Sequence, residues 1–331
     1  MYLKNTLLTV NKNGLYCAAG DFYIDPWRGV DRAVVTHGHS DHARPGSRLY
    51  LSCKKSELIL KERLGNRISL QTADYNSPVV INGVTVSFHP AGHIPGSAQV
   101  RVEHRGEIWV VSGDYKLEDD GLSDPFEPVK CHAFITESTF GAPVYHWEPQ
   151  EKVYEAVNGW WSRNCMQGKT SVIYAYSLGK SQRLINGLDH AIGRIYCHPA
   201  VASMNERVRQ SGFTLKECTP LSLKEEQDYR GAMVIIPQSS GISEYMRRFT
   251  APEDAYISGW MQIKKMRKSS GRPAAFTLSD HADWPGLLKA IKATGAHRIY
   301  ATHGYTELLT RWLLDSGYDA SVLPSPYTGR E

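Results

Sequence analysis

The sequence lacks the features that define several common classes of protein. No apolar run approaches the roughly 20 residues that a membrane-spanning helix requires, and the first residues carry no signal-peptide pattern. There is no internal repeat and no low-complexity linker. A net charge of +4 on 331 residues is too small to argue for a polyanionic ligand. We therefore expect a cytoplasmic protein with no membrane partner.

Cysteine is sparse, and its spacing is irregular. The chain has 6 cysteines, and no two of them form a CxxC pair. This spacing argues against a disulfide framework, so we expect free thiols in a reducing compartment. The hydrophobic content of 41% and charged content of 22% are ordinary for a globular enzyme. A chain of this length can bury a large core, and we expect two lobes.

Histidine, in contrast, is concentrated in one short stretch. Residues 36–42 read Thr-His-Gly-His-Ser-Asp-His and follow an apolar run that we expect to be a buried strand. Imidazoles and carboxylates suit a divalent transition metal. His37 and His39 are two apart, so an extended backbone can direct both to one ion, whereas the adjacent Asp41 and His42 suit a turn into a helix and a second ion. The alternative is a polar loop in which histidines cluster by chance.

Residues of the same chemical kind follow other short, β-rich runs. Each run is apolar and is closed by Gly, Ser or Asp, which is typical of buried strands. If the strand ends converge on one rim, they build a single polar site over an apolar core. The runs and the residues after them are 84–88 before His93, 108–111 before Asp114, 133–136 before Glu137, 274–278 before His281, and 298–302 before His303.

The middle of the chain has a different pattern. Helical periodicity appears in 151–161 and 181–192, and short strands are expected at 171–176, 193–197 and 232–237. This alternation predicts a small α/β domain inserted into the first. The expected domains are therefore 1–140, an insert at 141–270, and a return to the first domain at 271–331.

Together these motifs resemble the metallo-β-lactamase fold, in its nucleic-acid-processing branch called β-CASP. The HxHxDH pattern at 37–42, the AGH around His93 and the SGD around Asp114 are shared with ordinary hydrolases of that fold. The resemblance covers nearly the whole chain. It implies an α/β protein, an αββα sandwich with an inserted α/β β-CASP domain.

Three further positions resemble the β-CASP branch specifically. They are Glu137 at a strand end, His281 in the run Leu-Ser-Asp-His-Ala-Asp, and His303 in Thr-His-Gly. The stretches 19–28 and 42–47 are similar to the bacterial ligase-associated DNA exonucleases, which are found with an ATP-dependent DNA ligase and a helicase. The resemblance therefore implies DNA, especially strand ends or single strands, as the binding partner, and a functional partnership with those two enzymes.

The resemblance also implies roles for individual residues. Two divalent ions, zinc or manganese, would hold a hydroxide between them and bind the oxygens of a phosphodiester. Among the catalytic residues, Asp41 would act as a ligand, His281 would donate a proton to the leaving oxygen, and Glu137 would hold the other ring nitrogen of that histidine. His37, His39, His93 and Asp114 would bind the first ion, and Asp41, His42, Asp114 and His303 the second.

Four functions are compatible with these observations. The leading hypothesis is a metal-dependent DNA exonuclease that processes DNA ends in repair together with a ligase. The second is a β-CASP RNA-processing nuclease similar to the mRNA 3′-end endonuclease, which His303 keeps open. A small-molecule metallohydrolase gives no account of Glu137, His281 and the insert together. An inactive scaffold would normally have lost ligands, and here every ligand position is filled.

Two aspartates near the N-terminus have open interpretations. Asp21 and Asp25 border an expected turn. They would either orient a ligating histidine through a hydrogen bond or serve the turn alone.

Overall fold

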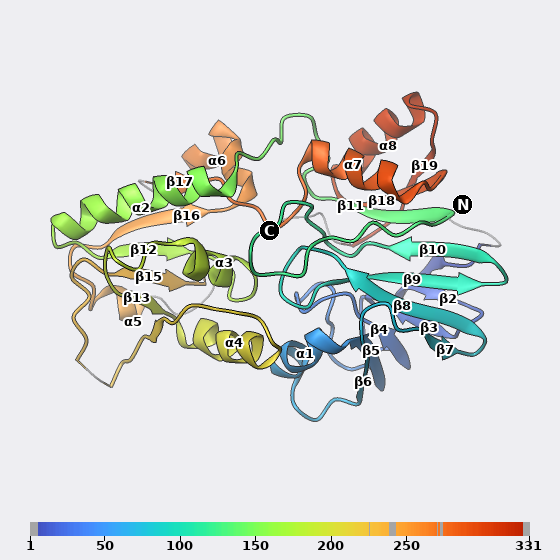
Figure 1. Ribbon diagram of the computed structural model, residues 1–331, viewed down its shortest axis with the longest axis horizontal. Helices are drawn as coiled ribbons and strands as arrows, with labels where there is room; N and C mark the ends of the chain where they lie inside the picture. Colours follow the sequence, from blue (N-terminus) through green and yellow to red (C-terminus); the bar gives the residue numbers. More distant parts are fainter. Residues whose placement is uncertain (1–5, 225, 238–242, 270, 272–273, 327–331) are drawn as a thin grey trace. The chain divides into compact units, whose positions relative to one another are not determined.

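The structure, a computed structural model, describes residues 6–224, 226–237, 243–269, 271 and 274–326. The chain folds into two compact units (Figure 1). The first comprises residues 1–146 and 281–331, and the second comprises 147–280. The first unit is thus built from two segments that are far apart in the sequence.

Two β-sheets form the centre of the first unit. The six-stranded sheet has the order β1-β2-β3-β4-β5-β6, and the seven-stranded sheet has the order β19-β18-β11-β10-β9-β8-β7. The strands of the six-stranded sheet are β1 (Thr9–Asn11), β2 (Gly14–Cys17), β3 (Phe22–Ile24), β4 (Arg32–Val34), β5 (Leu49–Cys53) and β6 (Leu70–Ala73). Those of the seven-stranded sheet are β7 (Val79–Ile81), β8 (Val84–Pro90), β9 (Ala98–His104), β10 (Glu107–Val111), β11 (Ala133–Ser138), β18 (Arg298–Gly304) and β19 (Asp319–Val322).

The two sheets pack face to face through a shared apolar core. Phe22 and Val34 from the six-stranded sheet belong to one buried cluster with Val100 and Trp109 from the seven-stranded sheet. Trp109 also stacks on Tyr300 of β18, with ring centroids 5.2 Å apart. Burial of this much apolar surface is the main stabilisation of a two-sheet sandwich.

Helices cover the outer faces of both sheets. Leu60 of α1 (Glu57–Leu64) packs with Ala33 of the six-stranded sheet. On the seven-stranded sheet, Leu287 of α7 (Trp284–Thr294) and Leu309 of α8 (Thr306–Asp315) pack with Phe134. Figure 1 shows α7 and α8 beside the β18 and β19 edge of this sheet. The first unit is therefore a four-layer αββα sandwich. A short 3-10 helix, η1 (Lys54–Ser56), leads into α1.

The second unit contains a third sheet with the order β14-β13-β15-β12-β16-β17, and all of its neighbouring strands run parallel. Because parallel strands need crossover connections, helices alternate with the strands along the chain. The strands are β12 (Ser171–Tyr174), β13 (Ile195–Cys197), β14 (Thr219–Pro220), β15 (Met233–Ile236), β16 (Glu253–Ile257) and β17 (Ala274–Phe276). The helices are α2 (Gln150–Met166), α3 (Lys180–Gly187), α4 (Pro199–Gln210), α5 (Ser243–Met246), η2 (Gly259–Gln262) and α6 (Lys264–Ser269).

The α/β class expected from the sequence is confirmed, and one strand lies in a different unit from the one we expected. The run 274–278 was expected in the first domain, but Ala274–Phe276 pairs with β16 and so extends the third sheet. The unit boundaries fall at 146/147 and 280/281, later than the expected 140/141 and 270/271. The identification of the second unit as a β-CASP insert stays a prediction.

None of the helices in the described part of the chain is both long and apolar enough to cross a lipid bilayer.

The contribution of the core between the two sheets to stability can be tested by replacing valine with alanine at a buried and at an exposed position. Val100 on β9 is fully buried in this core, whereas Val80 on β7 is 68% exposed. Val100→Ala should lower the free energy of unfolding by about 2 kcal/mol, because it deletes two buried methyl groups and leaves a cavity. Val80→Ala should change it by less than about 0.5 kcal/mol. Urea unfolding followed by tryptophan fluorescence measures both, and equal losses would contradict this assignment of the core.

Candidate metal centre

The first unit brings together all nine residues for which the sequence predicts a role at the site. His37, His39, Asp41 and His42 follow β4, and the other five come from later parts of the chain. His93 and Asp114 follow β8 and β10, Glu137 and His303 lie on β11 and β18, and His281 lies in the segment before α7.

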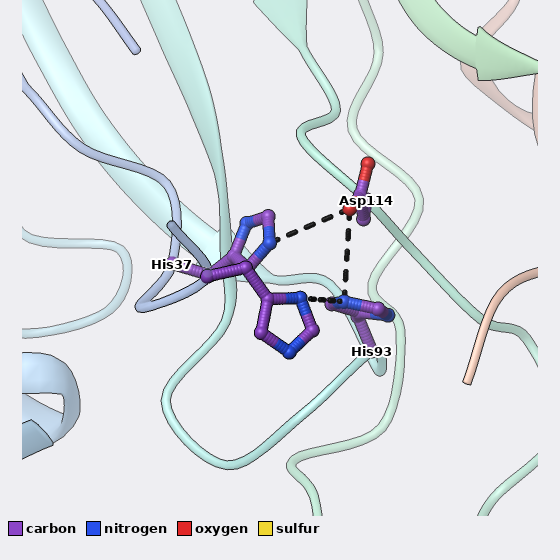
Figure 2. Close-up of side chains that lie close together, drawn as sticks. His37, His93 and Asp114 are labelled. Carbon is purple, nitrogen blue, oxygen red and sulfur yellow. Dashed lines mark hydrogen bonds and ion pairs between the residues drawn. The ribbon is translucent and has the colours of Figure 1, made fainter. Parts of the chain in front are cut away.

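A single carboxylate oxygen lies at the centre of the cluster. Oδ2 of Asp114 is 3.4 Å from Nε2 of His37, 3.4 Å from Nε2 of His42 and 3.7 Å from Nε2 of His93. Nε2 of His93 lies in turn 3.1 Å from Nδ1 of His39. Figure 2 shows His37 and His93 pointing toward Asp114 from two sides. These separations leave room for cations among the nitrogens and the oxygen.

The potential ligand atoms fall into overlapping groups. Asp114 belongs to a first group with three histidines and to a second group with His42 and His303. A third group joins it to Glu137 and His281. Asp41 lies outside these groups, with its Oδ2 3.7 Å from Nε2 of His42. The histidines of the first group are His37, His39 and His93.

Two buried nitrogens support metal binding directly. Within the described part of the chain, Nε2 of His37 and Nε2 of His42 have no hydrogen-bond partner. A buried polar atom without a partner destabilises a protein unless something else satisfies it. Both nitrogens face the Asp114 carboxylate, and a set of imidazole and carboxylate donors is the one that zinc and manganese accept. The residues therefore fit divalent metal ions.

Hydrogen bonds behind the histidines fix which ring nitrogen faces inward. Asp25 Oδ2 accepts a hydrogen bond from His42 Nδ1 at 2.7 Å and one from the Thr36 hydroxyl at 2.6 Å. Because that hydroxyl has given its only proton to Asp25, it accepts from His37 Nδ1, 3.0 Å away. Both imidazoles therefore carry a proton on Nδ1, so Nε2 is the nitrogen of each ring that can bind a metal ion, in His42 by replacing a proton.

The backbone around the cluster is shaped to bring these side chains close. The amide of Ala43 donates to the carbonyl of His39 at 2.8 Å, which forms the expected turn, but no helix follows it. At Gly92 a Cβ atom would lie 2.1 Å from the carbonyl oxygen of Lys116, so only glycine allows this approach. His303 has a φ of 57°, a left-handed conformation that is uncommon outside glycine.

Burial and the nearby carboxylates act in opposite directions on the site histidines. Burial lowers the pKa of His37 and that of His93 well below the usual value, so both are neutral, as metal ligands must be. Burial also opposes the charged form of His42, but the Asp114, Asp41 and Asp25 carboxylates raise its pKa well above the usual value. The positive charge of His42 in turn holds the pKa of Asp114 well below its usual value, although burial opposes this. The site thus maintains an ionised carboxylate that attracts cations.

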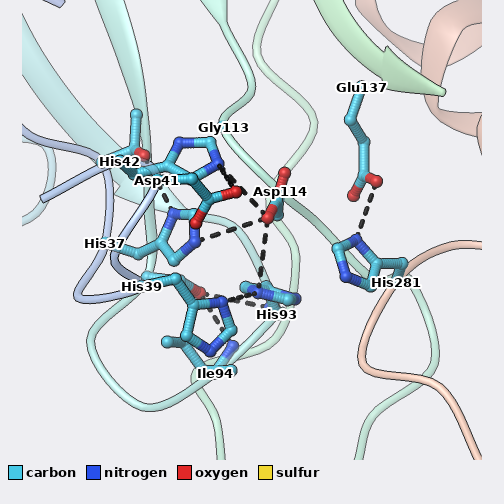
Figure 3. A network of polar contacts seen from close by, with 12 residues as sticks. His37, His39, Asp41, His42, His93, Ile94, Gly113, Asp114, Glu137 and His281 are labelled. Carbon is cyan, nitrogen blue, oxygen red and sulfur yellow. Dashed lines mark hydrogen bonds and ion pairs between the residues drawn. The ribbon is translucent and has the colours of Figure 1, made fainter. Parts of the chain in front are cut away.

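A second arrangement, the pair of Glu137 and His281, lies beside the cluster (Figure 3). Glu137 Oε2 is 2.8 Å from His281 Nδ1, and Glu137 Oε1 accepts the amide of Tyr115 at 2.7 Å. The His281 ring lies 4.6 Å from the His93 ring, centroid to centroid. Burial raises the pKa of Glu137. The pair is therefore close to the cluster and is held by hydrogen bonds from both sides.

The segment that carries His281 is anchored within the first unit by the two residues that follow it. The amide of Ala282 donates to the carbonyl of Tyr115 at 2.7 Å, and Asp283 caps α7 by accepting the amide of Gly286 at 2.9 Å. The neighbouring Asp280 instead pairs with Arg183 at 2.7 Å inside the second unit. This explains how a residue outside any strand can be placed as accurately as the strand-end residues.

Some residues that hold the site side chains in place cannot be identified from the sequence. Thr36 lies inside the histidine-rich stretch, but its spacing does not reveal that its hydroxyl links the ligand His37 to Asp25. Tyr115 acts through its backbone amide, which no sequence pattern can indicate. Asp25 had two open interpretations, and its contacts with His42 and Thr36 favour the orienting one. Asp21 contacts Tyr16 and Arg32 instead.

No family model matches the chain. Among curated proteins, it is 29% identical over 310 residues to a probable DNA ligase of Opitutus terrae, a match that covers 93% of this chain and 30% of that protein. It is also 24% identical to cleavage and polyadenylation specificity factor subunit 3-I of Arabidopsis thaliana, covering 68% of this chain and 40% of the relative. The chain therefore spans less than half the length of these relatives.

The chain is also similar to one further curated protein over a shorter range and to one solved structure at low sequence identity. The endoribonuclease YSH1 of Saccharomyces cerevisiae is 30% identical over 122 residues, which cover 36% of this chain and 15% of that protein. A solved structure of a protein of unknown function from Enterococcus faecalis matches with a TM-score of 0.56 at 12% identity, covering 89% of this chain and 79% of the other. At this sequence identity the structural match indicates a shared fold and nothing about function.

The contacts of Asp25 make its role testable against a matched control. Asp25→Asn should weaken metal binding about 10- to 100-fold, because both oxygens of Asp25 accept hydrogen bonds and an asparagine must turn its NH2 group toward one set of these donors. Asp21→Asn is the control, since Asp21 shares the left-handed backbone of Asp25, with φ values of 52° and 43°, and contacts no imidazole. Competition with a coloured chelator measures the affinity. Equal losses in the two variants would show that Asp25 serves only the turn.

Proposed function

We propose that this chain, which has the metallo-β-lactamase fold and is related to the β-CASP nucleases, is a metal-dependent DNA exonuclease that processes DNA ends. The αββα sandwich and the relatives together confirm the fold class expected from the sequence. The relatives support a hydrolase acting on phosphodiester bonds. The choice of DNA, the exonuclease action and the use of two ions are the proposal.

The observation that supports the proposal is that one unit contains both a candidate metal centre and a candidate proton donor. A buried carboxylate shared by several imidazoles provides sites for cations, and a hydrogen-bonded Glu137–His281 pair lies beside them. A metal centre alone gives no account of the Glu137–His281 pair. A proton donor beside the metal centre suits a phosphodiester substrate, because protonation stabilises its leaving oxygen.

The fit of the donor atoms assigns residues to each proposed ion. His37, His39, His93 and Asp114 would hold one, while Asp41, His42, Asp114 and His303 would hold the other. Divalent zinc or manganese ions bound there supply a water of lowered pKa and positive charge for the phosphate oxygens. Asp41 is the weakest member of this assignment, because its carboxylate contacts only His42 among the proposed ligands and is 40% exposed.

The proton for the leaving group comes from His281. Its Nδ1 is held by Glu137 at 2.8 Å, so its Nε2 is the nitrogen that can face the substrate. A carboxylate partner favours the imidazolium form, which donates the Nε2 proton to the ribose oxygen as the phosphodiester bond breaks. The Tyr115 amide keeps Glu137 from rotating away, so His281 is oriented before the substrate binds.

The preference for DNA rests on how much of this chain the match to one relative covers. The match to the probable DNA ligase covers 93% of this chain, whereas the match to the YSH1 endoribonuclease covers 36%. An enzyme that trims ends would prepare substrates for a ligase, so we include a cytoplasmic repair role with a DNA ligase and a helicase in the proposal. The alternative is an RNA-processing nuclease, which is supported by the similarity to the polyadenylation factor over 68% of the chain.

The substrate choice can be tested with end-labelled nucleic acids of matched sequence. With manganese or zinc present, the protein should shorten single-stranded DNA progressively from an end and leave the matching RNA intact. Denaturing gels over a time course reveal the product ladder. Cleavage of RNA with intact DNA would support the alternative, and internal cuts in circular single-stranded DNA would exclude a strict exonuclease.

The role of His281 can be separated from metal binding. His281→Asn should reduce kcat by about 10²- to 10⁴-fold with unchanged metal content, because only the proton donor is removed. The loss should shrink on a substrate whose leaving oxygen is replaced by sulfur, since a thiolate leaves without a proton. His104→Asn is the control, because His104 contacts the carbonyl of Gly83 in the same unit and lies outside the cluster. Loss of metal from His281→Asn would instead identify His281 as a ligand.

A further inference from the structure

Two cysteines of the second unit lie in direct contact. Cys197 ends β13, and Cys218 immediately precedes β14, which pairs in parallel with β13. Their Sγ atoms are 2.8 Å apart. A disulfide bond requires about 2.05 Å between the sulfurs, so less than an ångström of movement would join them. The sequence spacing of 21 residues gives no sign of this contact.

The two thiols differ in their surroundings. Cys197 is fully buried, whereas Cys218 is partly exposed and can meet a small molecule from solvent. The side-chain amide of Asn205 donates to Cys218 Sγ at 3.2 Å, and the Cys197 thiol, 2.8 Å away, can donate to the same sulfur when Cys218 is ionised. That hydrogen bond lowers the pKa of Cys218, and the positive charge of Arg209 acts in the same direction. Cys218 is therefore the better nucleophile of the two.

We infer that Cys197 and Cys218 form a reversible redox pair in which Cys218 is the site of oxidation by a hydroperoxide and Cys197 is the resolving thiol. In the first step the Cys218 thiolate attacks a peroxide oxygen, the O–O bond breaks, and a sulfenic acid and one water (or alcohol) are produced. In the second step the Cys197 sulfur attacks the Cys218 sulfur, the S–O bond breaks, and a second water leaves with the thiol proton. The two thiols lose two electrons, and the peroxide gains them.

The oxidation state of the pair is connected to a loop by buried hydrogen bonds within the second unit. Asn205 Oδ1 accepts from Gln182 Nε2 at 2.7 Å, and Gln182 also donates to the carbonyl of Ser177 at 2.9 Å. Gln182 Oε1 accepts the amide of Gly179 at 2.7 Å, and Gly179 has a φ of 92°. Disulfide formation draws Cys218 Sγ toward Cys197 and so disturbs the sulfur to which Asn205 donates. Oxidation should therefore loosen residues 177–182, which are the loop before α3 and the first residues of that helix.

Mass spectrometry of the full-length protein tests the pair. After treatment with a small excess of hydrogen peroxide and alkylation of the remaining thiols, the protein should contain one disulfide linking Cys197 and Cys218, which dithiothreitol reverses. Cys197→Ser should accumulate a sulfenic acid on Cys218 that dimedone traps, whereas Cys218→Ser should keep Cys197 reduced. Cys165→Ser is the control and should behave like the unchanged chain, because the Cys165 thiol donates to the carbonyl of Ile192 and not to another cysteine.

Hydrogen exchange measures the effect on the loop. Amides of 177–182 should exchange at least severalfold faster after oxidation of the unchanged chain, and their exchange should be the same before and after peroxide treatment in Cys218→Ser, which cannot be oxidised at the pair. Circular dichroism checks that each variant is folded. If both thiols remain alkylatable after peroxide treatment, the redox pair is refuted, and if the disulfide forms without a change in loop exchange, the coupling through Asn205 is refuted.

Discussion

The structure of the site depends on one buried negative charge. Asp114 is almost inaccessible to solvent, yet three imidazole nitrogens lie within 3.7 Å of one of its oxygens. A carboxylate in such a place is stable only if positive charge or metal ions compensate it. His42 can supply part of that charge from protons, and the arrangement of the other imidazoles is suited to replacing protons by metal ions. The surrounding layers, the two sheets and their helices, hold these groups in position before any ligand arrives.

The hydrogen bonds behind the ligands matter as much as the ligands themselves. Asp25 and Thr36 decide which nitrogen of His42 and of His37 is available, and Glu137 does the same for His281. In each case a carboxylate, acting alone or through a hydroxyl, binds the Nδ1 side of a ring and leaves Nε2 for chemistry. The same arrangement therefore serves both the proposed metal ligands and the proposed proton donor. It explains why His37, His42 and His281 can be buried with one ring nitrogen hydrogen-bonded and the other available for chemistry.

The sequence indicates which polar residues gather in one cluster more closely than it indicates where the units begin and end. Residues such as His93 and Asp114 directly follow short apolar runs, and strand ends on a shared rim bring such residues together for simple geometric reasons. The strand at 274–276 looks the same in the sequence, because an edge strand of a parallel sheet and a strand of a sandwich have the same apolar composition; only its pairing with β16 assigns it to the second unit. Contacts between distant side chains, such as Cys197 with Cys218, leave no local pattern to detect.

The discontinuous first unit has a consequence for the order of events during synthesis. His281 and His303 are translated after the whole second unit, and β18 must pair with β11 before His303 can reach the cluster. A ribosome-bound chain that ends before β18 can complete the parallel sheet of the second unit but not the rim on which catalysis would depend. The proposed metal centre is therefore completed only when the seven-stranded sheet has received β18, so chain topology alone places its formation late in synthesis.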